Sequence, residues 1–207
     1  MGNVYYRFEA VPVLAPLIAL LCVFLAVRAV RGNAGPQWGW RFVPIRLVAA
    51  VYVAGVIAVT HFPFVISYGK YADHMPWTSQ VSWVLLINMD PSAIPNIIMT
   101  VPMGILLPLV TKKITSWWRA LAFGAVVSLA IEVSQVLGCV LFHNYRGADV
   151  NDVIVNALGC LLGYWTVRLA VKISFLGNPL RHLALPGSVL ATGPGSVKRT
   201  ALARSRW

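Results

Sequence analysis

The sequence predicts an all-α integral membrane protein with about five transmembrane helices. Its 207 residues are 58% hydrophobic and only 11% charged, whereas soluble domains carry about a quarter charged residues. Five stretches are apolar and close to the length of about 20 residues that a bilayer crossing requires. The basic residues are also distributed unevenly between the loops, which is typical of multi-pass proteins. Together these observations exclude a disordered chain and disfavour a soluble enzyme.

The expected spans follow one another along the chain, and residues 70–90 form the longest external connection. The first covers residues 10–27, and Arg28 and Arg31 follow it where a signal peptide would have small cleavage-site residues, so we expect an uncleaved span. The other four cover residues 47–69, 91–111, 120–142 and about 151–171. Within lipid each must be helical, because only a helix satisfies its own backbone hydrogen bonds. Prolines in the first and third spans predict kinks.

Loop charges predict the orientation. Alternating connections place 14 of the 17 basic residues on one side of the membrane and Arg7, Lys70 and Arg146 on the other. The positive-inside rule makes the richer side cytoplasmic, so we expect an external N-terminus and a cytoplasmic C-terminus in the cell membrane. All six acidic residues then lie outside or within the membrane, which puts carboxylate chemistry on the external side. These residues are Glu9, Asp73, Asp90, Glu132, Asp149 and Asp152.

The composition divides the chain into three parts. Residues 1–43 hold the first span and a basic loop, residues 44–174 the membrane bundle, and residues 175–207 a basic tail rich in Gly, Pro and Ser that we expect to be flexible. The net charge of +11 is explained by cytoplasmic loops, so no nucleic-acid partner is expected. Three cysteines lie in apolar stretches without C-x-x-C spacing, which predicts neither a disulfide framework nor a metal site.

Polar residues inside the spans fall on single helical faces. In the fourth span Ser128, Glu132 and Gln135 recur at i, i+4 and i+7, and Asn96 enters the third span from the same external side. A second stripe forms if the fifth helix starts near its first member. It runs through Arg146, Asp149, Asp152, Asn156, Gly159 and Gly163. We expect these faces to converge in one polar pocket in the outer half of the bilayer.

The same residues carry a resemblance to a known family. The blocks are Asn96 to Pro102-Met-Gly104, then Ser128-x3-Glu132-x2-Gln135, then Arg146-x2-Asp149-x2-Asp152-x3-Asn156-x2-Gly159. Over about residues 93–171 the chain resembles the VanZ family, which is named for a protein associated with resistance to the glycopeptide antibiotic teicoplanin. The resemblance implies a multi-pass protein of the cell membrane with a role in the cell envelope. It does not imply a particular reaction.

Roles follow from the chemistry of these side chains. Charges within a bilayer are costly, about 2.5–3.5 kcal/mol or more at mid-span, and usually functional. The candidate catalytic or cation-binding groups are Glu132, Asp149 and Asp152. The candidate ligand-binding groups are Asn96, Gln135, Arg146 and Asn156, with Arg146 placed to contact an anionic headgroup. Helix packing is assigned to Pro102, Gly104, Ser128, Gly159 and Gly163, the last two as a G-x-x-x-G pair.

The leading hypothesis is a protein that binds or modifies an envelope component, lipid-linked or glycopeptide, at the outer leaflet, and so alters teicoplanin sensitivity. One alternative is a small transporter or flippase subunit, and another is a structural membrane protein that binds a protein partner. In the structural case Arg146 pairs with Asp149 or Glu132, and the amides only hold helices together. The sequence leaves open whether a reaction is catalysed, whether a divalent cation is bound and whether the chain oligomerises.

Overall fold

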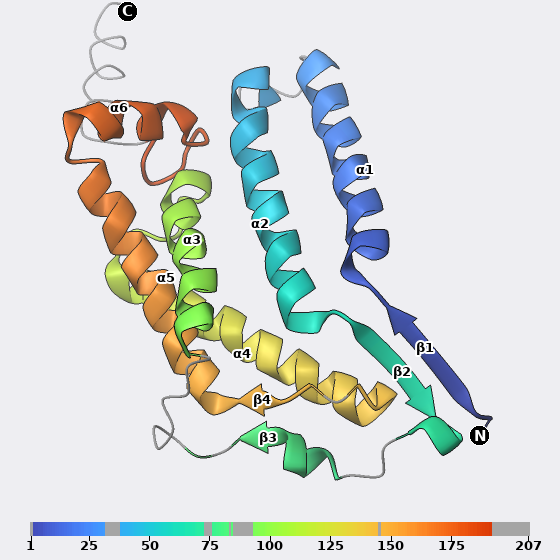
Figure 1. Cartoon of the computed structure of the whole chain (residues 1–207). Helices are drawn as coiled ribbons and strands as arrows, with labels where there is room; N and C mark the ends of the chain where they lie inside the picture. Colours follow the sequence, from blue (N-terminus) through green and yellow to red (C-terminus); the bar gives the residue numbers. More distant parts are fainter. Residues whose placement is uncertain are drawn as a thin grey trace, which may run out of the picture.

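The computed structural model describes residues 2–31, 38–72, 76–82, 84, 93–144 and 146–191. It contains five helices that are long and apolar enough to cross a membrane, as the sequence predicts (Figure 1). These are α1 (Ala10–Arg31), α2 (Val43–His61), α3 (Ala93–Val110), α4 (Trp117–Phe142) and α5 (Val150–Ala170). A shorter helix, α6 (Ser174–Leu183), follows α5.

Two small sheets gather several helix ends at one end of the molecule. Strand β1 (Val4–Phe8) pairs antiparallel with β2 (Phe64–Tyr68), so the start of α1 lies beside the end of α2. Strand β3 (Val81–Ser82) pairs in parallel with β4 (Ala148–Asp149), which brings the loop before α3 to the loop between α4 and α5 (Figure 1). This end carries the N-terminus and corresponds to the side that the sequence predicts to be external.

The opposite end collects the basic connections. The guanidinium of Arg41, before α2, donates to the carbonyl of His182 in α6 over 3.1 and 3.2 Å. The backbone N–H of Leu185 donates to the carbonyl of Leu109 at the end of α3 over 2.8 Å. The alternation of the loops between two ends therefore agrees with five spans. Which end faces the cytoplasm stays a prediction.

The second span differs from its predicted bounds of 47–69. Helix α2 begins at Val43 with a proline in its first turn and ends at His61. A proline fits the first turn because its missing N–H is unpaired there anyway. Pro63 follows the helix end and residues 64–68 form β2, because a proline cannot continue the helical hydrogen bonds. The hydrophobic run includes both elements, so hydropathy alone places the boundary too late.

The predicted flexible tail is wrong for residues 175–191. Helix α6 occupies residues 174–183, and Ala184 and Leu190 are buried against Ile45, Leu109 and Val167. The backbone N–H of Leu190 donates to the carbonyl of Pro108 over 3.1 Å. Scattered apolar residues thus anchor a segment whose Gly and Pro content is typical of a loop. The rest of the tail, 192–207, lies outside the described residues.

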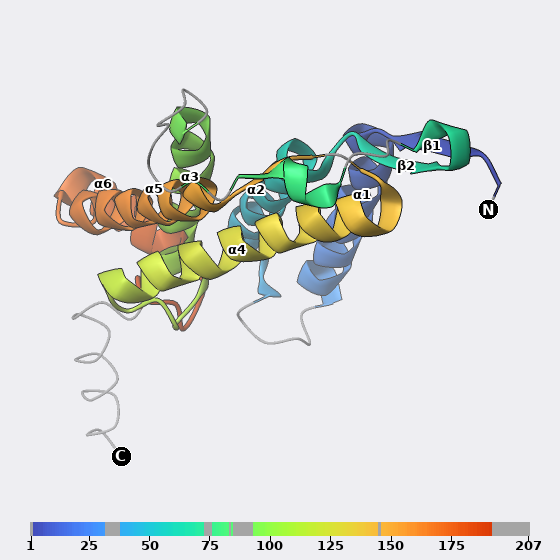
Figure 2. The same ribbon diagram turned by 90° about the horizontal axis from the view of Figure 1, so that it is seen from below.

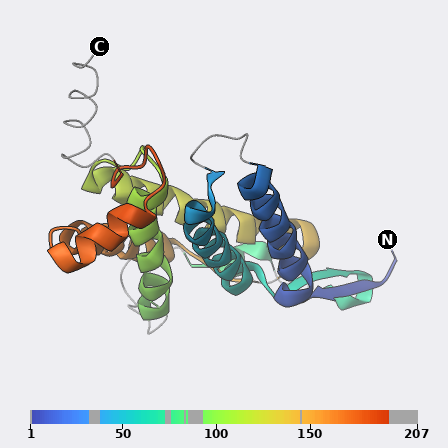
Figure 3. The same ribbon diagram turned by 90° about the horizontal axis from the view of Figure 1, so that it is seen from above.

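The helices form two groups. Helix α3 packs most closely on α5, and α4 packs on α5, whereas α1 packs mainly on α2. Figure 3 shows the α1–α2 pair set beside α3 and α5, and Figure 2 shows α4 crossing obliquely beneath the bundle. The contact between α2 and the second group is more limited, and it is where the candidate site lies.

Candidate functional site

A polar pocket of about 230 Å³ lies between α2, α3, α4 and the start of α5. Six of the residues singled out from the sequence line it, and Thr60, Val59, Met99, Ile131 and Gly147 complete the lining. The six are Asn96, Glu132, Gln135, Arg146, Asp152 and Asn156. The structure therefore brings the three polar helix faces together, at the end of the bundle that carries the N-terminus.

The two pocket carboxylates have defined partners. The Glu132 side chain is only 8% exposed, and its Oε2 accepts a hydrogen bond from the backbone N–H of Asp149 over 2.9 Å. The Asp152 carboxylate interacts with the side-chain amide of Asn96 from α3. Each carboxylate thus has a hydrogen-bonding partner that holds it in the pocket. Its oxygens can accept further hydrogen bonds.

Arg146 supplies the positive charge of the pocket. It lies in the loop before α5, and its Nη1 donates to the carbonyl of Val59 at the end of α2 over 2.7 Å. Among the residues that the structure describes, the ion pair within 4.0 Å is Arg7–Glu9. Arg146 therefore pairs with neither Glu132 nor Asp152. A guanidinium has five N–H donors, so Arg146 can also bind a ligand.

The deepest polar side chain of the pocket is Asn156, which is 2% exposed. Its Nδ2 donates to the hydroxyl of Ser128 over 2.8 Å, and that hydroxyl donates to the carbonyl of Asp152 over 3.2 Å. Its Oδ1 is buried and has no hydrogen-bond partner within the described part of the chain. Buried acceptors are nearly always paired, so this oxygen can accept a hydrogen bond from a group that enters the pocket.

A more open outer pocket of about 390 Å³ adjoins the polar pocket, because Gly147 and Asp152 line both. Its wall comes from the short 3-10 turn Trp77–Gln80, from β3 and from β4. The polar side chains in this wall are Ser79, Gln80, Ser82, Asp149 and Asp152. The two pockets therefore form a polar path from the bundle interior to the surface at this end.

Comparison with known proteins identifies the family. A family model described as VanZ/LLP1 matches residues 14–171, which is more than half of the chain. The chain belongs to the VanZ/LLP1 family. The match includes all the residues of the polar pocket, and it extends beyond the region 93–171 in which motifs were visible, over most of α1 and all of α2. No curated protein and no solved structure matches the chain.

In this VanZ/LLP1-family protein Asp149 lies outside the polar pocket, although the sequence places it on one stripe with Arg146. Helix α5 begins at Val150, and Asp149 is its N-cap. The Asp149 Oδ1 accepts from the backbone N–H and the side-chain amide of Asn151 over 2.8 and 2.9 Å. An aspartate is favoured as an N-cap because it satisfies a free N–H of the first turn. Both Arg146 and Asp149 therefore precede the helix.

Sequence reasoning missed the contribution of α2. The side-chain amide of Gln135 donates to the carbonyl of Thr60 over 2.9 Å, and the Thr60 hydroxyl lies 2.7 Å from Nδ1 of His61. The Nε2 of His61 lies 2.7 Å from the hydroxyl of Ser134. A Thr-His pair at the end of an apolar run is only a weak sequence signal of a polar site. The backbone carbonyls of Val59 and Thr60 leave no side-chain signal at all.

The glycines assigned to packing lie where α3 meets α5, whereas Ser128 lies on α4 and contacts α5. A Cβ on Gly104 would overlap the carbonyl oxygen of Cys160, and one on Gly163 would overlap the carbonyl oxygen of Val101. Likewise, a Cβ on Gly159 would overlap the Thr100 hydroxyl. Glycines therefore allow the two backbones to touch. Pro102 lies within α3, and it does not line the polar pocket.

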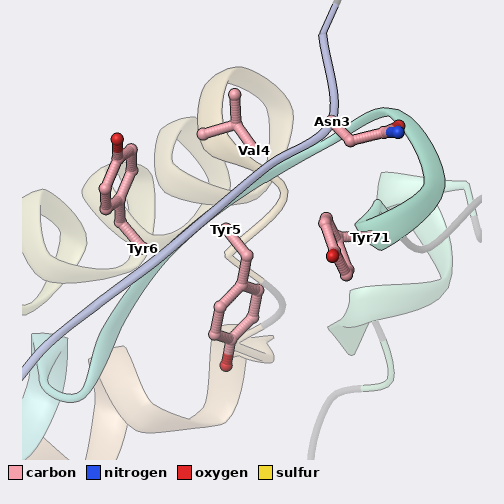
Figure 4. Close-up of a pocket in the computed structure, with 5 residues that line it drawn as sticks. All are labelled: Asn3, Val4, Tyr5, Tyr6 and Tyr71. Atoms are coloured by element: carbon pink, nitrogen blue, oxygen red, sulfur yellow. The ribbon is translucent and has the colours of Figure 1, made fainter.

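A separate hollow of about 700 Å³ lies at the two-stranded β1–β2 sheet and contains none of the predicted site residues. Its lining is Asn3, Val4, Tyr5, Tyr6 and Tyr71 (Figure 4). Tyr5 and Tyr71 lie on one side of the strand, with ring centroids 6.1 Å apart, and Tyr6 lies on the other. Exposed tyrosines at the end of membrane helices are typical of the bilayer interface.

The described residues offer no group of three or more His, Cys, Asp or Glu side chains arranged for a metal ion. The three cysteines of the protein are free thiols, and Cys139 and Cys160 are buried. In the polar pocket the carboxylates are Glu132 and Asp152.

Proposed function

We propose that this VanZ/LLP1-family protein binds the phosphate-bearing headgroup of a cell-envelope lipid at the outer leaflet. One observation carries the proposal: Arg146 shares the polar pocket with Glu132 and Asp152 but forms an ion pair with neither. Charged groups within a membrane protein are costly unless they are compensated or used. If the cluster were only a structural link between helices, direct Arg–carboxylate pairing would be the expected arrangement.

The lining groups define the chemistry of the headgroup. Arg146 donates hydrogen bonds and binds phosphate oxygens well. Asp152 and the Oδ1 of Asn156, which has no partner among the described residues, are acceptors, and they suit hydroxyl or ammonium groups of the ligand. The headgroup therefore combines an anion with nearby donors. Its hydrophilic remainder, such as the sugar or peptide part of a lipid-linked envelope precursor, extends into the outer pocket beside Ser79 and Ser82.

Two consequences belong to this proposal. Sequestering or altering an envelope lipid would change sensitivity to glycopeptide antibiotics such as teicoplanin, as the family resemblance suggests. If the bound headgroup is also modified, Glu132 and Asp152 are the groups placed to exchange a proton with it. Asp149 then acts indirectly, since it caps α5 and its N–H holds the Glu132 carboxylate.

The test is ligand binding to the purified protein in detergent. Thermal unfolding of the wild type should shift to higher temperature with a lipid-linked peptidoglycan precursor or with phosphatidylglycerol. Arg146→Gln and Asp152→Asn should each weaken the affinity about tenfold or more, because a hydrogen bond to a charged group contributes about 1.5–3 kcal/mol.

Arg7→Gln is the matched control. Arg7 lies at the same end of the molecule, but it is exposed, pairs with Glu9 and does not line the polar pocket. The Arg7→Gln variant should bind the lipids with the same affinity as the wild type. Equal affinity in Arg146→Gln and the wild type, or the absence of a shift with either lipid, would refute the proposal. Early melting of Arg146→Gln and Asp152→Asn without ligand would instead indicate a structural role.

A further inference from the structure

An apolar groove of about 370 Å³ runs between α2, α3 and α4. Its walls are formed by aliphatic and aromatic side chains, among them Val53, Met103, Leu107, Phe123 and Val127. This volume lies within the range of ligand sites, about 300–1,000 Å³. The groove is distinct from the polar pocket, and none of the candidate catalytic, ligand-binding or packing residues named from the sequence lines it.

The groove exists because polar contacts hold α2 to the second group of helices. The hydroxyl of Tyr52 donates to the carbonyl of Met99 over 3.0 Å. Near the end of α2, Gln135 and Arg146 donate to carbonyls of Thr60 and Val59. Such contacts fix the spacing of the helices. The small side chains along α2, such as Val53, then leave the space between them unfilled.

The groove and the polar pocket are continuous. Thr60 and Ile131 line both of them. From Thr60 the groove follows α2 to Ala49, a distance of about 16 Å along the helix at about 1.5 Å per residue. One leaflet of a bilayer has a hydrocarbon depth of about 15 Å, half of the total of about 30 Å. The groove thus has the length of a lipid chain and ends at a headgroup site.

We propose that this groove holds a hydrocarbon chain of the lipid whose headgroup binds in the polar pocket. The inference rests on the proposed function and specifies its ligand as a long-chain, phosphate-bearing lipid that enters sideways from the outer leaflet. A helix of a second copy fits less well, because an apolar helix leaves Arg146 and the Oδ1 of Asn156 without a ligand. A lipid satisfies the apolar and the polar part together.

The hydrocarbon chain of the lipid contributes more to the position of the headgroup than to the free energy of binding. Lipid tails are as apolar as the groove, so a chain that leaves the bilayer for the groove gains packing contacts and little transfer free energy. Its effect is to fix the headgroup against Arg146 and Asp152. The groove should therefore distinguish lipids by the length of their chains when the headgroup is the same.

The test compares two phosphatidylglycerols, one with dihexanoyl and one with dioleoyl chains, by native mass spectrometry of the purified protein. Val53 lines the groove and is 52% exposed, and Val51 on the same helix is 54% exposed and does not line it. Val53→Trp should weaken binding of the dioleoyl lipid about tenfold or more and leave the dihexanoyl lipid unaffected. Val51→Trp should change neither. Should Val53→Trp fail to fold, Val53→Phe replaces it.

The outcomes separate the two proposals. If neither phosphatidylglycerol binds the wild type, the groove proposal fails. The proposed function fails with it only if the lipid-linked peptidoglycan precursor also gives no thermal shift. If both lipids bind equally and Val53→Trp changes nothing, the headgroup site stands and the groove proposal is overturned. The same spectra report the oligomeric state. A dimer that Val53→Trp dissociates, with unchanged lipid binding, would identify the groove as a protein interface and also overturn the proposal.

Discussion

The hydroxyl of Ser128 joins the two polar helices of the site. It is 1% exposed, accepts a hydrogen bond from Asn156 on α5 and donates one to the carbonyl of Asp152. Ser128→Ala leaves the buried Nδ2 of Asn156 unpaired. We expect the free energy of unfolding to fall by about 1 kcal/mol, since interhelical hydrogen bonds in membranes contribute about 0.6–1.7 kcal/mol. Equilibrium unfolding in mixed micelles measures this change.

A second hydroxyl provides the comparison for Ser128. Thr166 on α5 is exposed, and its hydroxyl donates only to the carbonyl of Leu162 in its own helix over 2.8 Å. Thr166→Val should therefore change the free energy of unfolding by less than about 0.5 kcal/mol. An equal loss in both variants would show that the Ser128 hydroxyl has no special role between the helices.

At the scale of single residues, the helical period explains what the sequence could predict. Glu132, Gln135 and Asn156 fall on interior faces because positions three and four apart share a side of a helix. The period cannot fix where a helix begins, so it predicts Asp149 on the α5 stripe although Asp149 caps that helix. It also cannot report backbone groups, and Arg146 binds one, the carbonyl of Val59.

Among the elements, the contact between α3 and α5 depends on glycine. A Cβ on Gly104 would overlap the backbone of α5 at Cys160, which cannot move without displacing the helix. Gly104→Ala should therefore lower the free energy of unfolding by about 1–3 kcal/mol, the usual range for overpacking. Thermal unfolding in detergent checks this, and lipid binding should weaken with it because α5 carries Asp152 and Asn156.

Gly55 provides the control on another helix. A Cβ at this position of α2 meets no atom within 4 Å. Gly55→Ala should leave the stability unchanged or raise it slightly, since alanine is the better helix former by about 1 kcal/mol. If Gly104→Ala and Gly55→Ala change the free energy of unfolding equally, Gly104 does not act by allowing α3 and α5 to approach closely.

Element boundaries separate what hydropathy can and cannot predict. The five apolar helices are confirmed because backbone satisfaction in lipid leaves few alternatives to a helix. The end of α2 and the existence of α6 are missed for different reasons. Pro63 ends the helix while the hydrophobic run continues as β2, and hydropathy alone does not register that local signal. The segment after α5 depends on tertiary contacts instead, because apolar residues among Gly and Pro, such as Leu190, fold back on the bundle.

For the whole molecule, groove, polar pocket and outer pocket line up as one path. The groove shares Thr60 with the polar pocket, and the polar pocket shares Asp152 with the outer pocket. Their lining changes in that order from apolar, to charged, to a mixture of hydroxyl, amide and carboxylate groups. A lipid has the same order of chain, phosphate and hydrophilic group. The path therefore suits a lipid of the outer leaflet only if its polar end faces the outside of the cell.

Cysteine accessibility tests that direction. Ser79 in the outer pocket and Lys113 in the α3–α4 connection are both exposed, and they lie at opposite ends of the bundle. In a background with Cys22→Ala, Ser79→Cys should react with a membrane-impermeant maleimide in intact cells, because the positive-inside rule places it outside. Lys113→Cys should react only after the membrane is permeabilised. The reverse pattern would put the polar pocket in the inner leaflet, and the lipid would then have to be sought among cytoplasmic-face lipids.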